Sequence, residues 1–600
     1  MSEIVVGIDL GTTNSEIAIV RAGRIEVINI ENGVPILPSV VGLGDDDILL
    51  VGAAARNQYV LHPERTIRSI KRRMGEATHL ALGGKQYSPA EISAMILLRL
   101  KKIAEAHLGA AVARAVITVP AYFSDAQRQA TREAGEIAGL DVVRILNEPT
   151  AAALAYGAHR SQKEGSESRK SLVYDLGGGT FDVSVVNIEG DVVEVLASHG
   201  NNQLGGDDFD RCIIDFVLEH LNAVHGVDAA TVSASPTAMA RLQRAAEAAK
   251  IALSERPYAT LAEEFLLDKE GAPVHLSLEI SRHEYEEMIE PYIAETMDAV
   301  QVALTGAKLA VSDIDEVLLV GGATRTPLVS QRLEQITGIL PHSEIDPDLC
   351  VAMGAAIQAE IIAGGATPTV LIDVTPYTFG TSTLAFLGDR EYPFCFVPLI
   401  RRNTPIPASR SEVFYTVLDN QEKVEVTVFQ GESPDALDNI EIGRFTVEGL
   451  RKEPAGNPIV INFAIDINGI LNVRASEKKS GLECGITIDN AISRFADGKL
   501  DEARDRIRTM FGDDSEAPDG VDAHDADSTV ADHRRSLVEA DALVEKAERL
   551  LKTAGADDRE DLIDRIEAVR DAMAKSAPPS DGALAEAMGA LADVLYYLDN

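Results

Sequence analysis

Cysteine is scarce in this sequence, with four residues in 600: Cys212, Cys350, Cys395 and Cys484. They lie far apart, form no C-x-x-C pair and have no histidine at metal-ligand spacing. These absences argue against a disulfide framework and against a zinc site. Isolated cysteines of this kind are most often small buried hydrophobic residues of a protein from a reducing compartment.

Basic residues are also few relative to acidic ones. The chain has 55 lysines and arginines against 95 aspartates and glutamates, a net charge of −40. Binding to nucleic acid or to an anionic membrane surface needs a basic footprint. We therefore expect no nucleic acid and no membrane among the general partners, although a local basic groove remains compatible with the sequence.

Long apolar runs are missing as well. No stretch reaches the length that spans a bilayer, and the chain begins on a strand pattern without the basic-then-apolar profile of a signal peptide. With 46% hydrophobic residues, the composition is that of a globular protein of several domains. The expected location is the cytoplasm.

The most informative segment is residues 172–186, LVYDLGGGTFDVSVV. An apolar strand ends at Asp175, three glycines allow a tight turn, and a second strand returns from Asp182. Such a turn lets backbone N–H groups approach a phosphate, and the Thr180 hydroxyl with the two carboxylates suits a hydrated magnesium ion. Taken alone, the segment is equally compatible with an ordinary glycine-rich hairpin.

A second copy of this pattern lies at residues 7–20. It aligns with the first without a gap, so that Asp9 falls on Asp175 and Glu16 on Asp182. An internal duplication of a phosphate-type hairpin implies two similar half-domains, each of which offers one loop to a ligand between them. Chance packing of a single hairpin does not explain it.

The remainder of the first 365 residues alternates strand and helix patterns, which is typical of an α/β architecture. Residues 65–74 and 89–108 have helical character, and in the second of these the apolar residues recur at i, i+3 and i+4. A further helix is expected from Ser124 to Ala138, with Ser124 as its N-cap.

The pattern changes after residue 365. A short, proline-broken apolar stretch at 366–373 is a linker candidate, and residues 376–489 alternate in strand fashion without helical patterns, which indicates a β domain. The acidic segment 512–530 is expected to be disordered. Three amphipathic helices are expected to form a small antiparallel bundle. They cover residues 532–553, 557–576 and 581–598.

Together these patterns resemble the DnaK-type heat-shock chaperones. Five motifs carry the resemblance in the family's order and spacing: GIDLGTTNS (7–15), VPAYF (119–123), NEPTAAA (147–153), DLGGGTFD (175–182) and VGGATR (320–325). The short stretch after Lys71 lacks an insertion that housekeeping members carry. In this respect the chain looks closer to the specialised HscC-like branch.

The resemblance implies a multidomain α/β + β + α fold. An actin-like nucleotide-binding (ATPase) domain of two duplicated lobes would span residues 1–365, an interdomain linker 366–374 and a β-sandwich substrate-binding domain 375–490. An α-helical lid would span residues 491–600 and include the acidic segment 512–530. The partition made from the residue patterns alone is nearly the same.

For the nucleotide, the resemblance implies ATP or ADP, with Mg²⁺ and K⁺. Asp9 and Asp175 would hold hydrated magnesium. Lys71 would place its charge against the attacking water and the γ-phosphate, Glu148 would position that water, and Asp182 would order ions or water. The β- and γ-phosphates would lie against ten residues: Gly11, Thr12, Thr13, Asn14, Gly177, Gly178, Gly179, Thr180, Gly205 and Gly206.

The adenosine would lie against one helix face. Glu247, Lys250 and Ser254 are spaced i, i+3 and i+7, so that one face would present all three to a ribose and base. Without the resemblance, a solvated helix face with one ion pair is the simpler interpretation. The resemblance adds four residues of a later motif: Gly321, Gly322, Arg325 and Asp348. Among these, Arg325 would stack on the base.

Four further residues match family positions that couple nucleotide state to the linker. Pro120 matches a proline switch and Arg128 an arginine relay, while Arg144 and Asp373 match positions of J-domain contact. From the residues alone, Pro120 would be a strand terminator and Arg128 a helix-surface charge. The linker is less apolar than in relatives, because Thr369 replaces an aliphatic residue.

In the β domain, five positions match the family's peptide site: Leu384 and Val417, which would arch over the bound chain, and Phe414, Val424 and Val426, which would line the pocket. Such an apolar slot takes an extended Leu- or Ile-rich segment. The alternative is β-sandwich core, above all for Val426. Client preference stays open, because Thr381 replaces an aliphatic residue and the stretch from Phe386 to Phe396 is lengthened.

The function that follows is that of an ATP-dependent molecular chaperone, an ATPase that binds and releases extended hydrophobic segments of unfolded proteins. A J-domain co-chaperone and a nucleotide-exchange factor would be its partners. The main alternative is a weakly hydrolysing holdase or a relative that acts as an exchange factor. A sugar kinase or an actin-like filament protein would share the duplicated hairpin but would have no use for the β domain.

Overall fold

The computed structural model describes residues 4–511 with short gaps, and parts of the segment 540–594. The gaps are 31–32, 45–46, 162–167, 343, 366–368, 388–389, 468, 479 and 488–498. The chain divides into two compact units. The first comprises Met1–Thr369 and Phe495–Asp514, and the second Val370–Arg494 and Ser515–Asn600.

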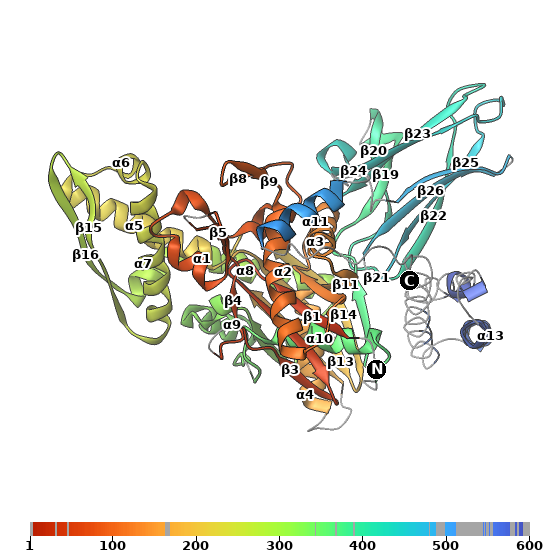
Figure 1. Ribbon diagram of the computed structural model, residues 1–600. Coiled ribbons are helices and arrows are strands. Elements are labelled where there is room, and N and C mark those ends of the chain that lie inside the picture. The colour runs from red at the N-terminus through yellow and green to blue at the C-terminus, as the bar shows by residue number, and fades with distance from the viewer. Residues whose placement is uncertain are drawn as a thin grey trace. The chain divides into compact units, whose positions relative to one another are not determined.

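Two β-sheets form the centre of the first unit (Figure 1). The first sheet contains, in spatial order, β11 (Asp141–Asn147), β10 (Arg114–Val119), β1 (Val5–Leu10), β2 (Asn14–Arg21) and β3 (Arg24–Val27). The second contains β17 (Glu316–Val320), β12 (Arg169–Leu176), β13 (Phe181–Glu189) and β14 (Val192–Asn201). In both sheets the first strand of a tight hairpin, β1 or β12, is antiparallel to the next strand and parallel to a later one, β10 or β17. The duplication expected from the sequence is therefore present as two equivalent strand arrangements.

Helices flank these sheets. Those before residue 200 are α1 (Ala53–Gln58), α2 (Pro89–Leu108), α3 (Asp125–Ile137) and α4 (Glu148–Ser161). Those after it are α5 (Gly206–His225), α6 (Ala229–Ser233), α7 (Pro236–Glu255), α8 (Arg282–Gly306), α9 (Pro327–Thr337) and α10 (Cys350–Ile362). Helix α3 matches the expected range, and α2 begins at a capping box in which Ser88 and Glu91 hydrogen-bond reciprocally. A Cβ at Gly354 would overlap the carbonyl of Ala151, so this glycine allows α10 to approach α4 closely.

The helix expected at residues 65–74 is not formed, and that prediction was wrong. The segment contains the end of a short 3₁₀ turn, η1 (Pro63–Arg65), then the strand β7 (Thr66–Ile67) and a second 3₁₀ turn, η2 (Ile70–Arg73). Strand β7 pairs with β5 (Val41–Leu43), and Ser69 has a left-handed backbone with φ of 51°. Pairing with a distant strand therefore overrides the local helical preference.

Small sheets complete the first unit. They are formed by β5 with β6 (Leu49–Val51) and β7, by β8 (Leu80–Leu82) with β9 (Lys85–Tyr87), and by the long hairpin of β15 (Tyr258–Lys269) and β16 (Ala272–Ser281), while β4 (Leu37–Pro38) pairs with β2. Each of the two central sheets has its own hydrophobic core. Two separate cores are expected in a unit of this size, because a single hydrophobic core stops growing beyond roughly 250–300 residues.

Helix α11 (Lys499–Met510) belongs to the first unit, although it follows the β domain in sequence. It lies beside α2 and α3, and it is the blue helix next to these orange ones in Figure 1. Ala503 and Ile507 are buried in the core of the first sheet, and Arg506 forms an ion pair with the buried carboxylate of Glu91. The family resemblance implied that this segment belongs with the helices that follow it, in a lid over residues 491–600.

The second unit contains two four-stranded antiparallel sheets. One contains β20 (Arg390–Ile400), β19 (Phe379–Leu387), β23 (Lys423–Gln430) and β24 (Ile440–Glu448), and the other β22 (Ala408–Tyr415), β25 (Pro458–Ile465), β26 (Leu471–Glu477) and β27 (Leu482–Thr487). Strand β18 (Val370–Val374) pairs with β21 (Pro405–Ile406), and η5 (Ala436–Asp438) is a short 3₁₀ turn. Apolar residues from both sheets share one core. The described residues from 370 to 487 include no α-helix, which confirms the expected β domain.

Of the three C-terminal helices expected, α13 (Ala556–Lys575) is described, and it packs through Leu562, Ile566 and Val569. Most of the other two, the acidic segment 512–530 and linker residues 366–368 lie outside the described residues. All four cysteines are free thiols. In the part of the chain that the structure describes, a helix long and apolar enough to cross a bilayer is not found.

Candidate functional site

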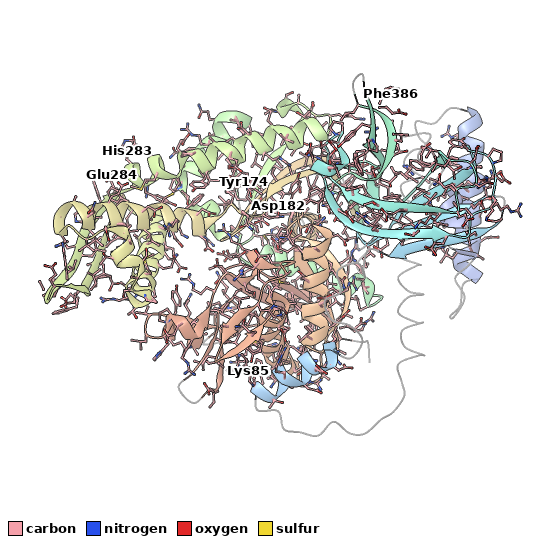
Figure 2. The ribbon with its side chains drawn as sticks, turned by 90° about the horizontal axis from the view of Figure 1, so that it is seen from above. Lys85, Tyr174, Asp182, His283, Glu284 and Phe386 are labelled. Atoms are coloured by element: carbon pink, nitrogen blue, oxygen red, sulfur yellow. The ribbon has the colours of Figure 1, made fainter. Side chains whose placement is uncertain are left out.

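The two equivalent hairpins place carboxylates opposite each other. Across β1 and β2, Asp9 faces Glu16, and across β12 and β13, Asp175 faces Asp182. Figure 2 labels Asp182 on the second sheet. Glu16, Asp175 and Asp182 are buried, and the Thr118 hydroxyl donates a hydrogen bond of 2.8 Å to Asp9. The duplication therefore concentrates four carboxylates at equivalent positions of the two sheets.

Lys71 and Glu148 are brought to the same site from η2 and the first turn of α4. They form a buried ion pair. Burial alone would lower the pKa of Lys71, but the attraction of Glu148 and Asp9 outweighs it and raises that pKa. Burial raises the pKa of Glu148 to about 7, and the negative charge of Asp9 adds to the rise that Lys71 opposes. The site holds one buried lysine and several buried carboxylates.

The excess of buried negative charge favours a cation. Burial raises the pKa values of Asp9, Asp175 and Asp182, and the neighbouring carboxylates raise those of Asp9 and Asp175 further. The pKa of Glu16 is raised by burial first and by Asp9 second. A positive ion among these groups would stabilise their ionised forms.

The residues present fit magnesium as an ion that is held mainly by water and phosphate. Among the described residues, no group of three or more His, Cys, Asp or Glu side chains is arranged to hold a metal ion. Asp9 and Asp175 offer two carboxylates. Mg²⁺ commonly takes one or two carboxylates and completes its octahedron with phosphate oxygens and water.

The turn between β12 and β13 is joined to the start of α5. The Gly206 N–H donates to the Gly177 carbonyl at 3.0 Å, and the Asp207 N–H donates to the Gly178 carbonyl at 2.7 Å. A Cβ at Gly205 would lie 2.6 Å from the backbone nitrogen of Gly179. These first N–H groups of the 20-residue helix α5 therefore hold the glycine turn against the helix, and the positive end of the helix dipole lies beside the turn.

The two glycine turns approach each other closely. A Cβ at Gly178 would overlap the Thr13 side chain, and one at Gly179 would lie 2.8 Å from the Thr12 hydroxyl. That hydroxyl is buried and has no hydrogen-bond partner among the described residues. A buried hydroxyl without a partner costs about 1–3 kcal/mol. An acceptor oxygen of a bound phosphate would remove this cost, so the cradle fits a polyphosphate.

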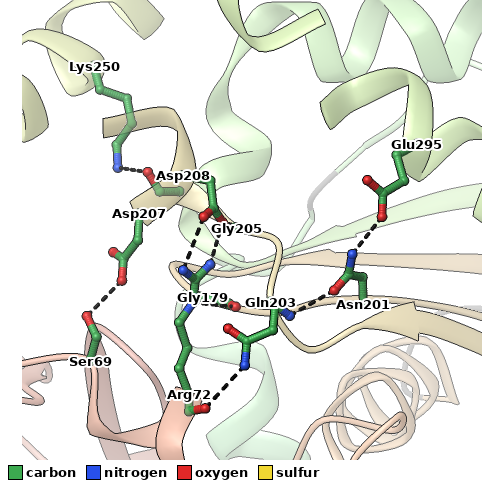
Figure 3. Close-up of polar contacts among 11 residues, drawn as sticks. Ser69, Arg72, Gly179, Asn201, Gln203, Gly205, Asp207, Asp208, Lys250 and Glu295 are labelled. Atoms are coloured by element: carbon green, nitrogen blue, oxygen red, sulfur yellow. Dashed lines mark hydrogen bonds and ion pairs between the residues drawn. The ribbon is translucent and has the colours of Figure 1, made fainter. Parts of the chain in front are cut away.

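Several charged residues that hold this cradle were missed by the sequence analysis. The Arg72 Nε donates to the Gly179 carbonyl at 2.9 Å, and the guanidinium forms an ion pair with Asp208 (Figure 3). The Ser69 hydroxyl donates to Asp207 at 2.7 Å. The basic run 71–73 and the acidic pair after the glycines at 205–206 were the available signals, but neither indicates its partner.

The face of α7 that was assigned to adenosine is engaged by protein groups. Lys250 forms an ion pair with Asp210 at 2.8 Å and donates to the Gly206 carbonyl at 3.0 Å. Glu247 forms an ion pair with Arg68 at 3.4 Å, and the Ser254 hydroxyl donates to the Lys250 carbonyl. Burial raises the pKa of Asp210 to about 6, while Lys250 opposes the rise. Lys250 thus lies beside the start of α5.

The later glycine motif lies against the end of β12. It contains η4 (Gly322–Arg325). Gly321 has φ of 81°, and a Cβ there would lie 2.5 Å from the Leu176 carbonyl oxygen. A Cβ at Gly322 would lie 2.9 Å from the Asp348 carboxylate, which accepts a 2.7 Å hydrogen bond from Arg325. The structure therefore brings this motif next to the phosphate-type turn.

Pro120 and Arg128, two of the four residues assigned to coupling, are connected to Asp182 through the backbone after Pro120. The N–H groups of Ala121 and Tyr122 donate to the Asp182 carboxylate at 3.2 and 3.1 Å. Arg128 donates to the Ala121 carbonyl at 2.9 Å and to the Asn147 amide oxygen at 2.6 Å. Arg128 is therefore tied into the site and is not a solvated helix charge.

Arg144 lies on β11 of the first unit, and Asp373 lies on β18 of the second. Both side chains are buried.

The five residues assigned to peptide binding differ in the exposed fraction of their side chains. Val426 is 1% exposed in the core, Phe414 and Val424 are partly buried against that core, and Leu384 and Val417 are 45% and 60% exposed.

A protein-family model matches this chain. The model described as Hsp70 protein matches residues 5–81 and 77–593. These two ranges together cover nearly the whole chain, including both units and the site described above.

Proposed function

The chain belongs to the Hsp70 family, whose members are ATPases and chaperones, and we propose that it is an ATP-driven chaperone in which the nucleotide state of the first unit controls peptide binding by the second. The observation that carries this proposal is the cradle of two glycine turns together with the buried Lys71–Glu148 pair, whose lysine is attracted by Asp9 and Asp175 of the two hairpins. It combines the binding and the charge that phosphoryl transfer to water requires.

Each residue of the site has a role in the proposed hydrolysis. The turns at 11–14 and 177–180 bind the β- and γ-phosphates through N–H groups and through the Thr12 and Thr180 hydroxyls. The Glu148 carboxylate accepts a hydrogen bond from the attacking water. Lys71 offsets the negative charge that develops on the γ-phosphoryl oxygens. Asp9 and Asp175 would hold a magnesium ion, which would supply further charge neutralisation.

The adenosine would lie between the α7 face and the motif that follows β17. Lys250 and Arg325 are both held by carboxylates, Asp210 and Asp348, so their positions are set before nucleotide binds.

Potassium is proposed as a second cation, since the site has more buried carboxylates than one magnesium ion binds. We also propose that the chain belongs to the HscC-like branch and that it acts in the cytoplasm.

The second unit would hold an extended client segment between Leu384 and Val417, over a pocket lined by Phe414 and Val424. Both proposed arch residues are exposed, as a client contact requires. Helices that follow α11 would close over it as a lid. A J-domain co-chaperone would act next to Arg144 and Asp373, whose own side chains are buried, and an exchange factor would release ADP. A holdase that hydrolyses weakly is the second candidate, because the linker is less apolar than in relatives.

The experiment is fluorescence anisotropy of a labelled extended Leu-rich peptide on the full-length protein. We expect slow exchange with ADP and fast release when ATP and magnesium are added. Thr180→Ala should bind ATP but hydrolyse it slowly, and it should still release peptide. Peptide binding that does not respond to nucleotide would favour the holdase, and no peptide binding would reject the chaperone proposal.

A further inference from the structure

Glu16 is a buried carboxylate to which the proposed function gives no role. It lies on β2 directly opposite Asp9, and it is 2% exposed. In the second hairpin Asp182 has the equivalent position, and its carboxylate accepts hydrogen bonds from the N–H groups of Ala121 and Tyr122. Within the described residues, the Glu16 carboxylate has neither a hydrogen bond nor an ion pair. A carboxylate buried in this way requires a ligand that the chain itself does not supply.

The Glu16 side chain does not lie in the apolar core of its sheet. Ile8 and Ile17, the neighbouring opposed pair, are fully buried in that core. Successive residues of a strand alternate between the two faces, so Asp9 and Glu16 share the other face. Helix α10 packs on this second face against Ala18. Glu16 therefore lies on the same side of the sheet as the carboxylate assigned to magnesium.

The charges around Glu16 are mainly negative. Burial raises the pKa of Glu16 well above its usual value, and the charges of Asp9 and Asp348 raise it further. Lys71 opposes this rise in pKa, but its ammonium already forms an ion pair with Glu148. A divalent cation beside Asp9 would supply the positive charge that Glu16 lacks.

We infer that Glu16 is a further metal-positioning residue, so that the first hairpin offers the divalent ion of the nucleotide site two carboxylates, Asp9 and Glu16, rather than one. The inference rests on the proposed nucleotide site. Magnesium keeps several water ligands when it is bound, and groups that hold such ligands set its affinity as well. An ion held largely through water agrees with the absence, among the described residues, of three side chains placed to ligate one metal ion.

The same charge makes nucleotide binding depend on the metal ion. Without the ion, Glu16 adds a negative charge to the site of the polyphosphate and opposes nucleotide binding. With the ion bound, this charge is compensated. Glu16 therefore increases the factor by which the metal ion strengthens ADP binding, and linkage requires that ADP strengthen metal binding by the same factor.

The test measures binding of Mn²⁺, a paramagnetic substitute for magnesium, to the full-length protein with ADP. Electron paramagnetic resonance reports free Mn²⁺, and so gives the affinity without turnover. Glu16→Gln, which keeps the size of the side chain, should weaken Mn²⁺ binding about 10–100-fold. Glu16→Asp, which keeps the charge, should stay close to wild type. In EDTA, the affinity of Glu16→Gln for ADP should be no lower than that of wild type.

Glu316→Gln is the matched control, because Glu316 is also a buried strand carboxylate, on β17, and accepts a hydrogen bond from the Ser171 hydroxyl. It should keep the wild-type affinity for Mn²⁺. A loss of the same size in this control would overturn the inference.

Three results for the Glu16 variants would also overturn the inference while the proposed function stands. They are wild-type Mn²⁺ affinity in Glu16→Gln, a loss in Glu16→Asp as large as in Glu16→Gln, and an equal loss of ADP affinity with and without metal in Glu16→Gln. The last two would assign Glu16 a packing role. A wild-type protein that binds neither ADP nor Mn²⁺ would overturn both the inference and the proposed function.

Discussion

Lys71 and Glu148 form an ion pair in which both side chains are less than a tenth exposed. Lys71 comes from a 3₁₀ turn and Glu148 from the first residue of α4. A buried ion pair is a costly arrangement unless its charges have a further use. The Lys71 ammonium also lies 5.9 Å from the centre of the Phe123 ring, which limits water around it.

Replacing Lys71 by methionine should abolish most ATP hydrolysis. The change removes the positive charge at the γ-phosphate position, and the loss of one such group typically slows catalysis about 10²–10³-fold. Steady-state phosphate release would measure the rate, and a fluorescent nucleotide its affinity, which we expect to change less than the rate. Lys85→Met, an exposed lysine on β9, is the control (Figure 2). Normal turnover in Lys71→Met would remove this residue from the mechanism.

The raised pKa of Glu148 predicts a pH dependence of stability. The pKa rises from 4.5 to about 7 on folding, so the folded protein holds a proton between these values that the unfolded chain has lost. This contribution is fully present below pH 4.5 and is lost as pH rises through 7, with an upper limit of about 3 kcal/mol. The nucleotide-free protein should therefore be less stable at pH 8 than at pH 6.

Comparing wild type with Glu148→Gln isolates this group. The difference in unfolding free energy between the two proteins, measured with denaturant at pH 6 and pH 8, should change in favour of the variant at pH 8. An unchanged difference would show that Glu148 does not titrate in this range. The glutamine keeps the size of the side chain and cannot ionise.

Arg72 and Asp208 should be energetically coupled. Their side chains are about one-fifth exposed, and the guanidinium also binds the Gly179 carbonyl, so the pair fixes the glycine turn. A double-mutant cycle with alanine should give a coupling of about 1–2 kcal/mol. The exposed pair Arg211–Asp215 on α5 is the control, with less than about 0.5 kcal/mol expected. Equal coupling in both pairs would contradict the assignment.

Two glycines of the same turn should respond differently to alanine. A Cβ at Gly179 would lie 2.8 Å from both Arg72 Nε and the Thr12 hydroxyl, whereas one at Gly177 would have its nearest neighbour at 3.6 Å. Gly179→Ala should cost about 1–3 kcal/mol through overpacking, and Gly177→Ala should cost little in the nucleotide-free protein. Denaturant unfolding measures both. Similar values for the two variants would show that the turns do not approach as described.

Ile507→Ala should loosen α11 from the first unit. Ile507 is fully buried against the core of the first sheet, and removing its side chain typically costs about 2–5 kcal/mol. Limited proteolysis should then cut the segment 495–514 faster. Thr509→Ala, at an exposed position of the same helix, should leave the cleavage rate unchanged. Cleavage at the wild-type rate in Ile507→Ala would argue against this packing.

Features of the site that depend on neighbouring residues could be predicted from the sequence, whereas contacts between distant elements could not. The hairpins with Asp9 and Asp175 were predictable, because a strand, a glycine turn and a returning strand are specified by neighbouring residues and the pattern occurs twice. The ion pair of Arg72 with Asp208 was not predictable, because it depends on how η2 approaches the start of α5. The helix predicted at 65–74 was wrong for the same reason, since β7 pairs with a strand far away in sequence.

The sequence by itself determined the duplicated hairpins, the β domain and the set of residues that resembles a nucleotide site. Only the tertiary structure decided how these residues are paired and buried. Lys71 pairs with Glu148, Val426 lies in the core while Leu384 is exposed, and α11 packs with the first unit. Local patterns fix backbone conformation over a few residues. Burial and charge pairing depend on elements that meet only after the chain has folded.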